Sequence, residues 1–252
     1  MDELRSYAGK ANHVANLVYY WRPFLDQLWA ALSGSRSSVA SSGQVWVKQI
    51  KSSLSWILSF LREEEGSLRK SWRFDYYTNS GVRVTIYLDA SPYGLGAMLT
   101  ENDVLVAWFC TPLTHHDTTI HKRAIGDSDG QQVWEALAVL VAIRCWSARW
   151  VGKKTTITAK SDNMAALSML ASLKSKVSSL ICREVAFEMC RSSFQPRFIE
   201  HIPGVFNFSP DGLSRRWDPH YTSAQVRLPD ELEIEVPTRS WDYYRTLPVH
   251  RG

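Results

Sequence analysis

The stretch VRVTIYLDASPYGLGAML, Val82–Leu99, decides how this sequence is expected to fold. Apolar and polar residues alternate over 84–88, and this period of two predicts a half-buried β-strand. Asp89 stands where that strand ends, and Gly94 and Gly96 follow it. A partly buried carboxylate is unfavourable unless a cation or hydrogen-bond donors pair with it. Asp89 is therefore predicted to be either a cation ligand or a turn-forming residue, with the glycines letting the chain turn back tightly.

The composition is that of a globular protein with a mild excess of positive charge. The chain has 252 residues, 45% of them hydrophobic and 21% charged, and a formal net charge of +4, which permits a polyanionic partner without requiring one. Its four cysteines show no C-x-x-C spacing, so they predict free thiols in a reducing compartment rather than a zinc ribbon. The sequence contains neither a secretory signal pattern nor an apolar run long enough for a membrane span. We therefore expect an intracellular protein, cytoplasmic or nuclear, without a membrane partner.

Residues 1–80 carry helical patterns and no strand pattern. Two amphipathic blocks, 2–33 and 45–61, are joined by the Ser- and Gly-rich linker SGSRSSVASSG. Pro23 fits the first turn of a second helix within the first block, so a break is expected just before it. Gly66 is expected to end the second block. These residues are predicted to form a helical segment.

The pattern changes after Gly81 and predicts an α/β region over residues 81–217. In order along the chain it predicts strands over 82–90, 95–100 and 104–110, a helix over 131–150, a strand over 155–161, helices over 162–173 and 177–194, a strand over 197–202 and a helix over 209–215. Helices between the later strands require crossovers, so the sheet is expected to be mixed, with antiparallel strands first and parallel strands later. The polar residues 111–130 predict a loop, and residues 218–252 predict an extended, partly docked tail.

Four acidic residues lie at the ends of these predicted elements: Asp89, Glu135, Asp162 and Asp211. The ends of neighbouring strands in an α/β sheet share one edge, where ligands usually bind. Carboxylates gathered there would repel one another unless divalent cations neutralised them, and oxygen ligands favour Mg²⁺ or Mn²⁺ over zinc. Taken singly, Asp162 and Asp211 are equally good helix N-caps, and Glu135 could be an ordinary polar residue. Their joint order favours a shared cation site.

Four stretches of the chain resemble the ribonuclease H domain of retroelement reverse transcriptases of the gypsy-type and DIRS-like groups. They are YLDASPYGLGAML, VWEALAVLVAIRCW, AKSDNMAAL and HIPGVFNFSPDGLSR. The last is the most specific, since a strand ending in H-I-P-G is followed by Asn207 and then by D-x-L-S-R. LRSYAGKANHVANLVYYWRPFLDQLW resembles the segment that connects polymerase to ribonuclease H in these proteins. The resemblance covers about residues 1–217, and the polymerase motif Y-x-D-D is absent, so the chain resembles a C-terminal portion of a reverse transcriptase.

The resemblance implies an α/β, ribonuclease H-like fold, with a mixed five-stranded sheet flanked by helices behind an N-terminal helical connection segment. It implies that Asp89, Glu135, Asp162 and Asp211 are both the catalytic residues and the ligands of two Mg²⁺ ions, or of Mn²⁺. The implied substrate is an RNA/DNA hybrid, whose RNA strand is hydrolysed to a 5′-phosphate and a 3′-hydroxyl, and the implied partner is the polymerase part of a reverse transcriptase. HIPGVFNFSPD is too short for the histidine-bearing loop of many cellular ribonucleases H, so His201 is expected on a strand.

Other readings stay open on the sequence alone. The region could be a catalytically silent module that tethers a polymerase or another partner, a retroelement remnant, or another nuclease or integrase-like enzyme on the same fold. A zinc site is conceivable in the polar stretch HHDTTIH, although a surface loop explains it more simply; its candidate ligands are His115, His116, Asp117 and His121.

Basic residues near the predicted helix 177–194 could contact phosphates, and a solvated face explains them equally well. They are Lys174, Lys176, Arg183, Arg191 and Arg197. Arg215 and Arg216 follow Asp211 closely and could either hold the last helix or contact a phosphate.

Overall fold

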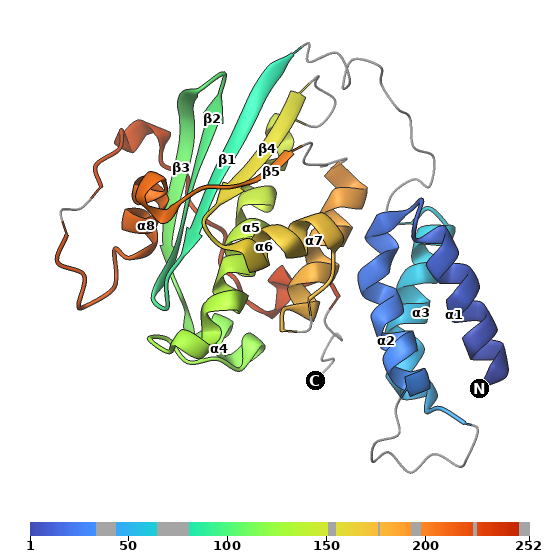
Figure 1. The fold of residues 1–252 in the computed structure, drawn as a ribbon. Helices are drawn as coiled ribbons and strands as arrows, with labels where there is room; N and C mark the ends of the chain where they lie inside the picture. The colour runs from blue at the N-terminus through green and yellow to red at the C-terminus, as the bar shows by residue number, and fades with distance from the viewer. Residues whose placement is uncertain are drawn as a thin grey trace.

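The computed structural model describes residues 1–33, 44–64, 81–150, 155–175, 177–192, 198–223 and 226–246 (Figure 1). The predicted linker and the predicted helix end at Gly66 lie outside these described residues. Among the helices described, none is long and apolar enough to cross a membrane.

The N-terminal part consists of helices, as predicted. They are α1 (Asp2–Val14), the short 3₁₀ turn η1 (Tyr19–Trp21), α2 (Arg22–Ser33) and α3 (Val47–Leu61). Pro23 is the second residue of α2, where its missing N–H is not needed, so the chain breaks just before it. Phe24, Ile57 and Phe60 are fully buried where α2 and α3 pack together.

Five strands form one mixed sheet in the order β3-β2-β1-β4-β5. Its strands are β1 (Val82–Ala90), β2 (Gly94–Glu101), β3 (Val104–Pro112), β4 (Thr155–Ser161) and β5 (Phe198–His201). The first three are antiparallel neighbours, whereas β4 and β5 are parallel additions beside β1. The predicted fold class, an α/β mixed five-stranded sheet of the ribonuclease H-like type, is confirmed. Because β1 is central, the residue at its end lies in the middle of one sheet edge.

Helices cover both faces of this sheet (Figure 1). The helices α5 (Gln131–Trp146), α6 (Met164–Ser172) and α7 (Ser179–Ser192) form one layer, in which α5 packs directly on β1 and β2. The short helix α8 (Phe208–Ser214) packs on β1, β2 and β3. The helix α5 is apolar nearly all round, which is typical of a helix buried on several sides.

The polar stretch predicted to be a loop contains a helix, α4 (His115–His121). A capping box starts it, because the Thr114 side chain accepts from the Asp117 N–H while the Asp117 carboxylate accepts from the Thr114 N–H. This correction has a local cause. The capping box was present in the sequence as T-x-x-D, but seven residues without an apolar stripe give no helical period.

The segment that follows α8 packs along the domain. Ile234 N–H donates to the Trp108 carbonyl at 2.9 Å, beside the outer strand β3. Farther on, the Thr246 N–H and hydroxyl both donate to Glu184 on α7. Its only regular turns in the described part are η6 (Asp230–Leu232) and η7 (Trp241–Tyr243). These described residues therefore contact both β3 and α7.

Deleting residues 1–80 is expected to leave the sheet folded and to make the chain associate. The N-terminal part covers Phe187 and Met189 of α7: Trp56 meets Phe187 edge-on with ring centroids 5.5 Å apart, and the Tyr19 hydroxyl donates to the Met189 sulfur at 3.5 Å. Its removal exposes those apolar side chains. Circular dichroism should still show a cooperative melt, while light scattering shows oligomers. A deletion chain that is unfolded, or one that stays monomeric, would contradict this.

Candidate active site

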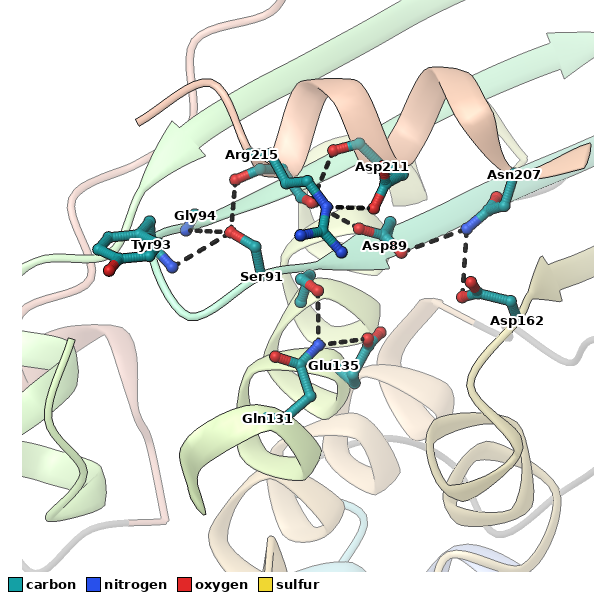
Figure 2. Close-up of polar contacts among 12 residues, drawn as sticks. Asp89, Ser91, Tyr93, Gly94, Gln131, Glu135, Asp162, Asn207, Asp211 and Arg215 are labelled. Carbon is teal, nitrogen blue, oxygen red and sulfur yellow. Dashed lines mark hydrogen bonds and ion pairs between the residues drawn. The ribbon is translucent and has the colours of Figure 1, made fainter. Parts of the chain in front are cut away.

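The four predicted acids gather at the edge of the sheet where β1 ends (Figure 2). Asp89 is the penultimate residue of β1, Glu135 lies in the second turn of α5, Asp162 directly follows β4, and Asp211 lies in α8. The Asn207 side-chain N–H₂ joins two of them, at 3.3 Å from Asp89 Oδ1 and 3.4 Å from Asp162 Oδ1. Four elements that are separate in the sequence thus bring one carboxylate each to a common place.

Asp89 and Glu135 are the two most buried acids of this cluster. Burial, opposed by the hydrogen bond with Ser214 and reinforced by the nearby Asp211 and Asp162, raises the pKa of Asp89 to about 8. Ser214 Oγ lies 2.5 Å from Asp89 Oδ2 and 3.0 Å from the Asp211 carbonyl oxygen. The Ser214 hydroxyl donates to the Asp89 carboxylate, and this hydrogen bond favours the charged form of Asp89 against the effect of burial.

Glu135 is buried, and only one of its two carboxylate oxygens accepts a side-chain hydrogen bond. Gln131 Nε2 donates to Glu135 Oε1 at 2.8 Å and to the Ala90 carbonyl at 2.6 Å, which ties the start of α5 to the end of β1. Glu135 Oε2 has no hydrogen-bond partner among the described residues. Burial and then the charge of Asp89 raise the pKa of Glu135 well above its usual range. A buried oxygen without a donor is the observation at this site that most favours a cation ligand.

Asp162 and Asp211 do not cap helices. The N-cap of α6 is Asn163, whose side-chain oxygen accepts from the Ala165 and Ala166 N–H groups at 2.9 and 3.0 Å, and this leaves Asp162 free of that role. Asp211 lies inside α8 and pairs with Arg215 Nε at 2.5 Å. The N-cap reading of these two acids is therefore wrong. Arg215 therefore holds the last helix through its ion pair with Asp211, which is one of the two roles considered for it from the sequence.

Asn207 and Ser214 are site residues that sequence reasoning did not single out as such. Asn207 is fully buried, and its side-chain N–H₂ also donates to the Leu88 carbonyl at 3.1 Å, so it fixes the end of β1 relative to Asp162. Ser214 supports Asp89 from α8. The sequence signal for Asn207 is its place in the motif HIPGVFNFSPDGLSR.

The two glycines after Asp89 serve a purpose different from the one predicted. The turn is made by Ser91–Tyr93, with Ser91 Oγ accepting from the Tyr93 and Gly94 N–H groups, and both glycines lie within β2. A Cβ on Gly96 would lie 2.5 Å from the Pro210 carbonyl oxygen, and one on Gly94 would lie 2.7 Å from the Ser214 carbonyl oxygen. The glycines let α8 rest against the sheet and so bring Asp211 to Asp89.

The histidine-rich stretch does not form a zinc site. Asp117 is fully buried and is held by Arg239, whose Nη2 lies 2.9 Å from Asp117 Oδ2. His121 Nε2 instead meets the Tyr244 hydroxyl at 2.9 Å, and burial lowers the pKa of His121 to about 4. The loop expectation for this stretch is wrong because it forms α4. The zinc alternative is wrong because residues from the tail contact side chains that a metal would need.

Three of the basic residues near α7 and α8 have defined surroundings in the part of the chain described. Arg191 lies over the Phe187 ring, 5.7 Å from its centroid, and burial lowers the pKa of Arg183. Arg216 Nη1 donates to the Cys110 sulfur of β3 at 3.1 Å. Lys176 and Arg197 lie outside the described residues. The four cysteines are free thiols, as predicted.

The four carboxylates are of the chemical type that divalent cations prefer as ligands. Their spacing in this structure, however, is too wide to hold a cation. All four side chains are carboxylates, the ligands preferred by Mg²⁺ and Mn²⁺, and Glu135 Oε2 is left without a donor. Within the described ranges, no three His, Cys, Asp or Glu side chains are assembled closely enough to hold a metal ion as they stand. Cation binding would therefore have to draw these carboxylates together.

The fold and the site define a ribonuclease H-like α/β domain with a carboxylate cluster at the end of its central strand. No family model matches the sequence, and no curated protein matches it. Solved structures similar to it include RNase H1 from the halophilic archaeon Halobacterium salinarum, with 19% identity over 52% of this chain and 93% of that one, at a TM-score of 0.39. An N-terminal RNase H domain from Mycobacterium tuberculosis, solved as a fusion with maltose binding protein, has 18% identity over 54% of this chain and 92% of that one, at a TM-score of 0.39.

A third similar structure comes from a larger protein. The foamy viral protease-reverse transcriptase dRH, in complex with double-stranded DNA, has 14% identity over 80% of this chain and 34% of that one, at a TM-score of 0.33.

Proposed function

We propose that this chain is a ribonuclease H-type endonuclease that hydrolyses the RNA strand of RNA/DNA hybrids, as part of a retrotransposon reverse transcriptase. The observation that carries the proposal is the gathering of Asp89, Glu135, Asp162 and Asp211 around the end of β1, with Asn207 joining two of them. The polymerase part of such a transcriptase is the proposed partner, and the cytoplasm or nucleus the proposed location.

The proposed cofactors are two Mg²⁺ ions, or Mn²⁺, held by the four carboxylates. When bound, such ions lower the pKa of the attacking water and stabilise charge on the phosphate oxygens. Asp89 would hold such an ion in its charged form, which the hydrogen bond donated by Ser214 Oγ favours. Gln131 holds Glu135 Oε1, which leaves Oε2 directed away from that hydrogen bond and available as a ligand.

The reaction proposed yields a 5′-phosphate and a 3′-hydroxyl. Selection for RNA would come from contacts to 2′-hydroxyl groups in the wide minor groove of the hybrid, because that groove displays them. Arg215 Nε pairs with Asp211 Oδ1 at 2.5 Å, and this ion pair holds the Asp211 carboxylate in place on α8.

Purified protein is expected to cleave a labelled RNA/DNA hybrid in Mg²⁺ and to leave RNA/RNA and DNA/DNA duplexes intact. Glu135→Gln should lower the rate by more than about 100-fold, because changes at residues that only support metal ligands already cost about 10–100-fold. Glu200→Gln is the matched control, since Glu200 is exposed and pairs with Lys160 on the neighbouring strand. Gel analysis of the products measures both. Equal rates in the two variants would contradict the assignment of Glu135.

A catalytically silent tether is the second candidate. One observation favours it, namely that the described acids are not assembled for a metal as they stand. A silent module predicts that Mg²⁺ leaves the melting temperature unchanged, whereas a cation site predicts a rise that grows with Mg²⁺ concentration.

A further inference from the structure

A short segment beside the carboxylates, Gly204–Phe208, exposes large apolar side chains. Val205, Phe206 and Phe208 have 76%, 71% and 68% of their surface exposed. Single exposed apolar residues are ordinary on protein surfaces, but several close together on one segment mark a site of interaction. None of the three is used by the core of the domain.

The segment is held rigidly against the acids. Asn207, between the two phenylalanines, is fully buried and donates to Asp89 and Asp162. A Cβ added to Gly204 would lie 3.1 Å from Asp162 Oδ2, so the backbone there passes directly over that carboxylate. The turn is closed by hydrogen bonds from the Phe206 and Asn207 N–H groups to the Pro203 and Gly204 carbonyls. Asn207 points inward to Asp89 and Asp162 (Figure 2) and so anchors its two exposed neighbours, Phe206 and Phe208, next to the cluster.

We propose that Phe206 and Phe208 are substrate-contacting residues, which touch the sugars and base edges of the nucleotides next to the scissile phosphate. This inference rests on the proposed function. A nucleic-acid strand whose phosphate reaches Asp89 and Asp162 must pass the segment Gly204–Phe208, because that segment is hydrogen-bonded to both carboxylates through Asn207. Phenylalanine offers an apolar face, and nucleic-acid-binding proteins use such faces against bases and sugars without sequence preference.

These contacts have a signature that distinguishes them from phosphate contacts. Basic side chains release counterions on binding, so removing one changes the slope of log affinity against log salt concentration. An apolar contact releases none. Removing the rings should therefore weaken binding by the same factor at every salt concentration.

The test measures binding of a fluorescein-labelled RNA/DNA hybrid to the full chain by anisotropy, in EDTA so that no cleavage occurs, over a series of salt concentrations. The double variant Phe206→Ala, Phe208→Ala should bind about tenfold more weakly, the low end of what aromatic–base contacts contribute, with an unchanged salt slope. Phe206→Tyr with Phe208→Tyr keeps both rings and should bind as the wild type does. Trp46→Ala, which removes an exposed aromatic residue at the start of α3, should have no effect.

The outcomes separate this inference from the proposed function. Equal affinity of the double alanine variant and the wild type would overturn the inference and leave the apolar segment to a protein partner, even if the hybrid is cleaved. A changed salt slope, or no binding of the hybrid by the wild type, would overturn it as well. The proposed function instead fails when the wild type binds the hybrid and cannot cleave it in Mg²⁺. The melting temperature should be the same in all variants, because the substituted rings are exposed.

Discussion

Replacing Asp89 with asparagine is expected to abolish cleavage of the hybrid while making the metal-free protein more stable at alkaline pH. Under the proposed function, cleavage should be lost because a neutral amide is a poorer cation ligand than a carboxylate. Stability is kept because the asparagine amide is uncharged and its oxygen can still accept from Ser214 Oγ, as Asp89 Oδ2 does. The variant therefore imitates the neutral form of Asp89 at every pH.

The direction of the pH effect follows from the raised pKa. The pKa of Asp89 is about 8 in the folded protein, against about 3.9 for an unperturbed aspartate. A raised pKa contributes stability that is fully present below the unfolded value and is lost as pH rises through the folded value. Wild type should therefore lose stability relative to Asp89→Asn between about pH 4 and pH 8. Because each unit of pKa corresponds to about 1.4 kcal/mol, the variant should be more stable by several kcal/mol above about pH 8, and its melting temperature should be higher by about 10 °C or more.

Magnesium should reverse this order of stability. If Asp89 is a ligand of the proposed cations, they should raise the melting temperature of the folded wild type by mass action, and the variant should respond much less. Thermal melts of both proteins in EDTA and in Mg²⁺, at about pH 5 and about pH 8.5, measure all of these effects. Equal responses to Mg²⁺ would favour the silent module. A variant less stable by about 1 kcal/mol at every pH would show that Asp89 is a turn-forming residue whose hydrogen bonds asparagine cannot copy.

The central strands and their acids were predictable because each has a local signal. Alternation over 84–88 sets β1 and places Asp89 at its end, and a similar pattern over 155–161 places Asp162 just after β4. The two-residue difference at the start of α6 arises because Asn163, and not Asp162, is the N-cap, with its side-chain oxygen accepting from the Ala165 and Ala166 N–H groups. Whether Asp89 and its partners act on RNA is not a matter of local pattern, and it stays a prediction for the assays above.

The glycines and the tail could not be predicted because their partners are distant in sequence. Periodicity cannot distinguish a glycine that forms a turn from one that admits a helix, and Gly96 needs its small size for Pro210 and the rest of α8. The tail has no apolar period, yet it carries Arg239, which pairs with a carboxylate 122 residues earlier. Such contacts are settled by tertiary packing and leave no repeating mark in either segment.

Arg239→Ala is expected to be the most destabilising single change in the described tail. The Arg239 side chain is 2% exposed and its partner Asp117 is 0% exposed. Arg239 Nε lies 3.0 Å from Asp117 Oδ1, and its Nη2 donates to the Pro112 carbonyl at 2.6 Å. Without the guanidinium, Asp117 is a buried charge with only the cap of α4 to satisfy it, and breaking such a pair costs about 3–5 kcal/mol.

Denaturant melts of two further variants test whether the buried charge causes the loss. Arg83→Ala breaks an ion pair with Asp103 that is exposed on both sides, so it should cost less than about 1 kcal/mol. The double variant Arg239→Met, Asp117→Asn removes the buried charge and keeps an oxygen for the Thr114 N–H, so it should recover much of the stability. If Arg239→Ala melts like Arg83→Ala, the tail does not close the domain, and the chain should then tolerate truncation after Trp217. If it falls by several kcal/mol and the double variant recovers, the residues beyond α8 are part of the folded unit that positions α4 and the start of α5 beneath the carboxylates.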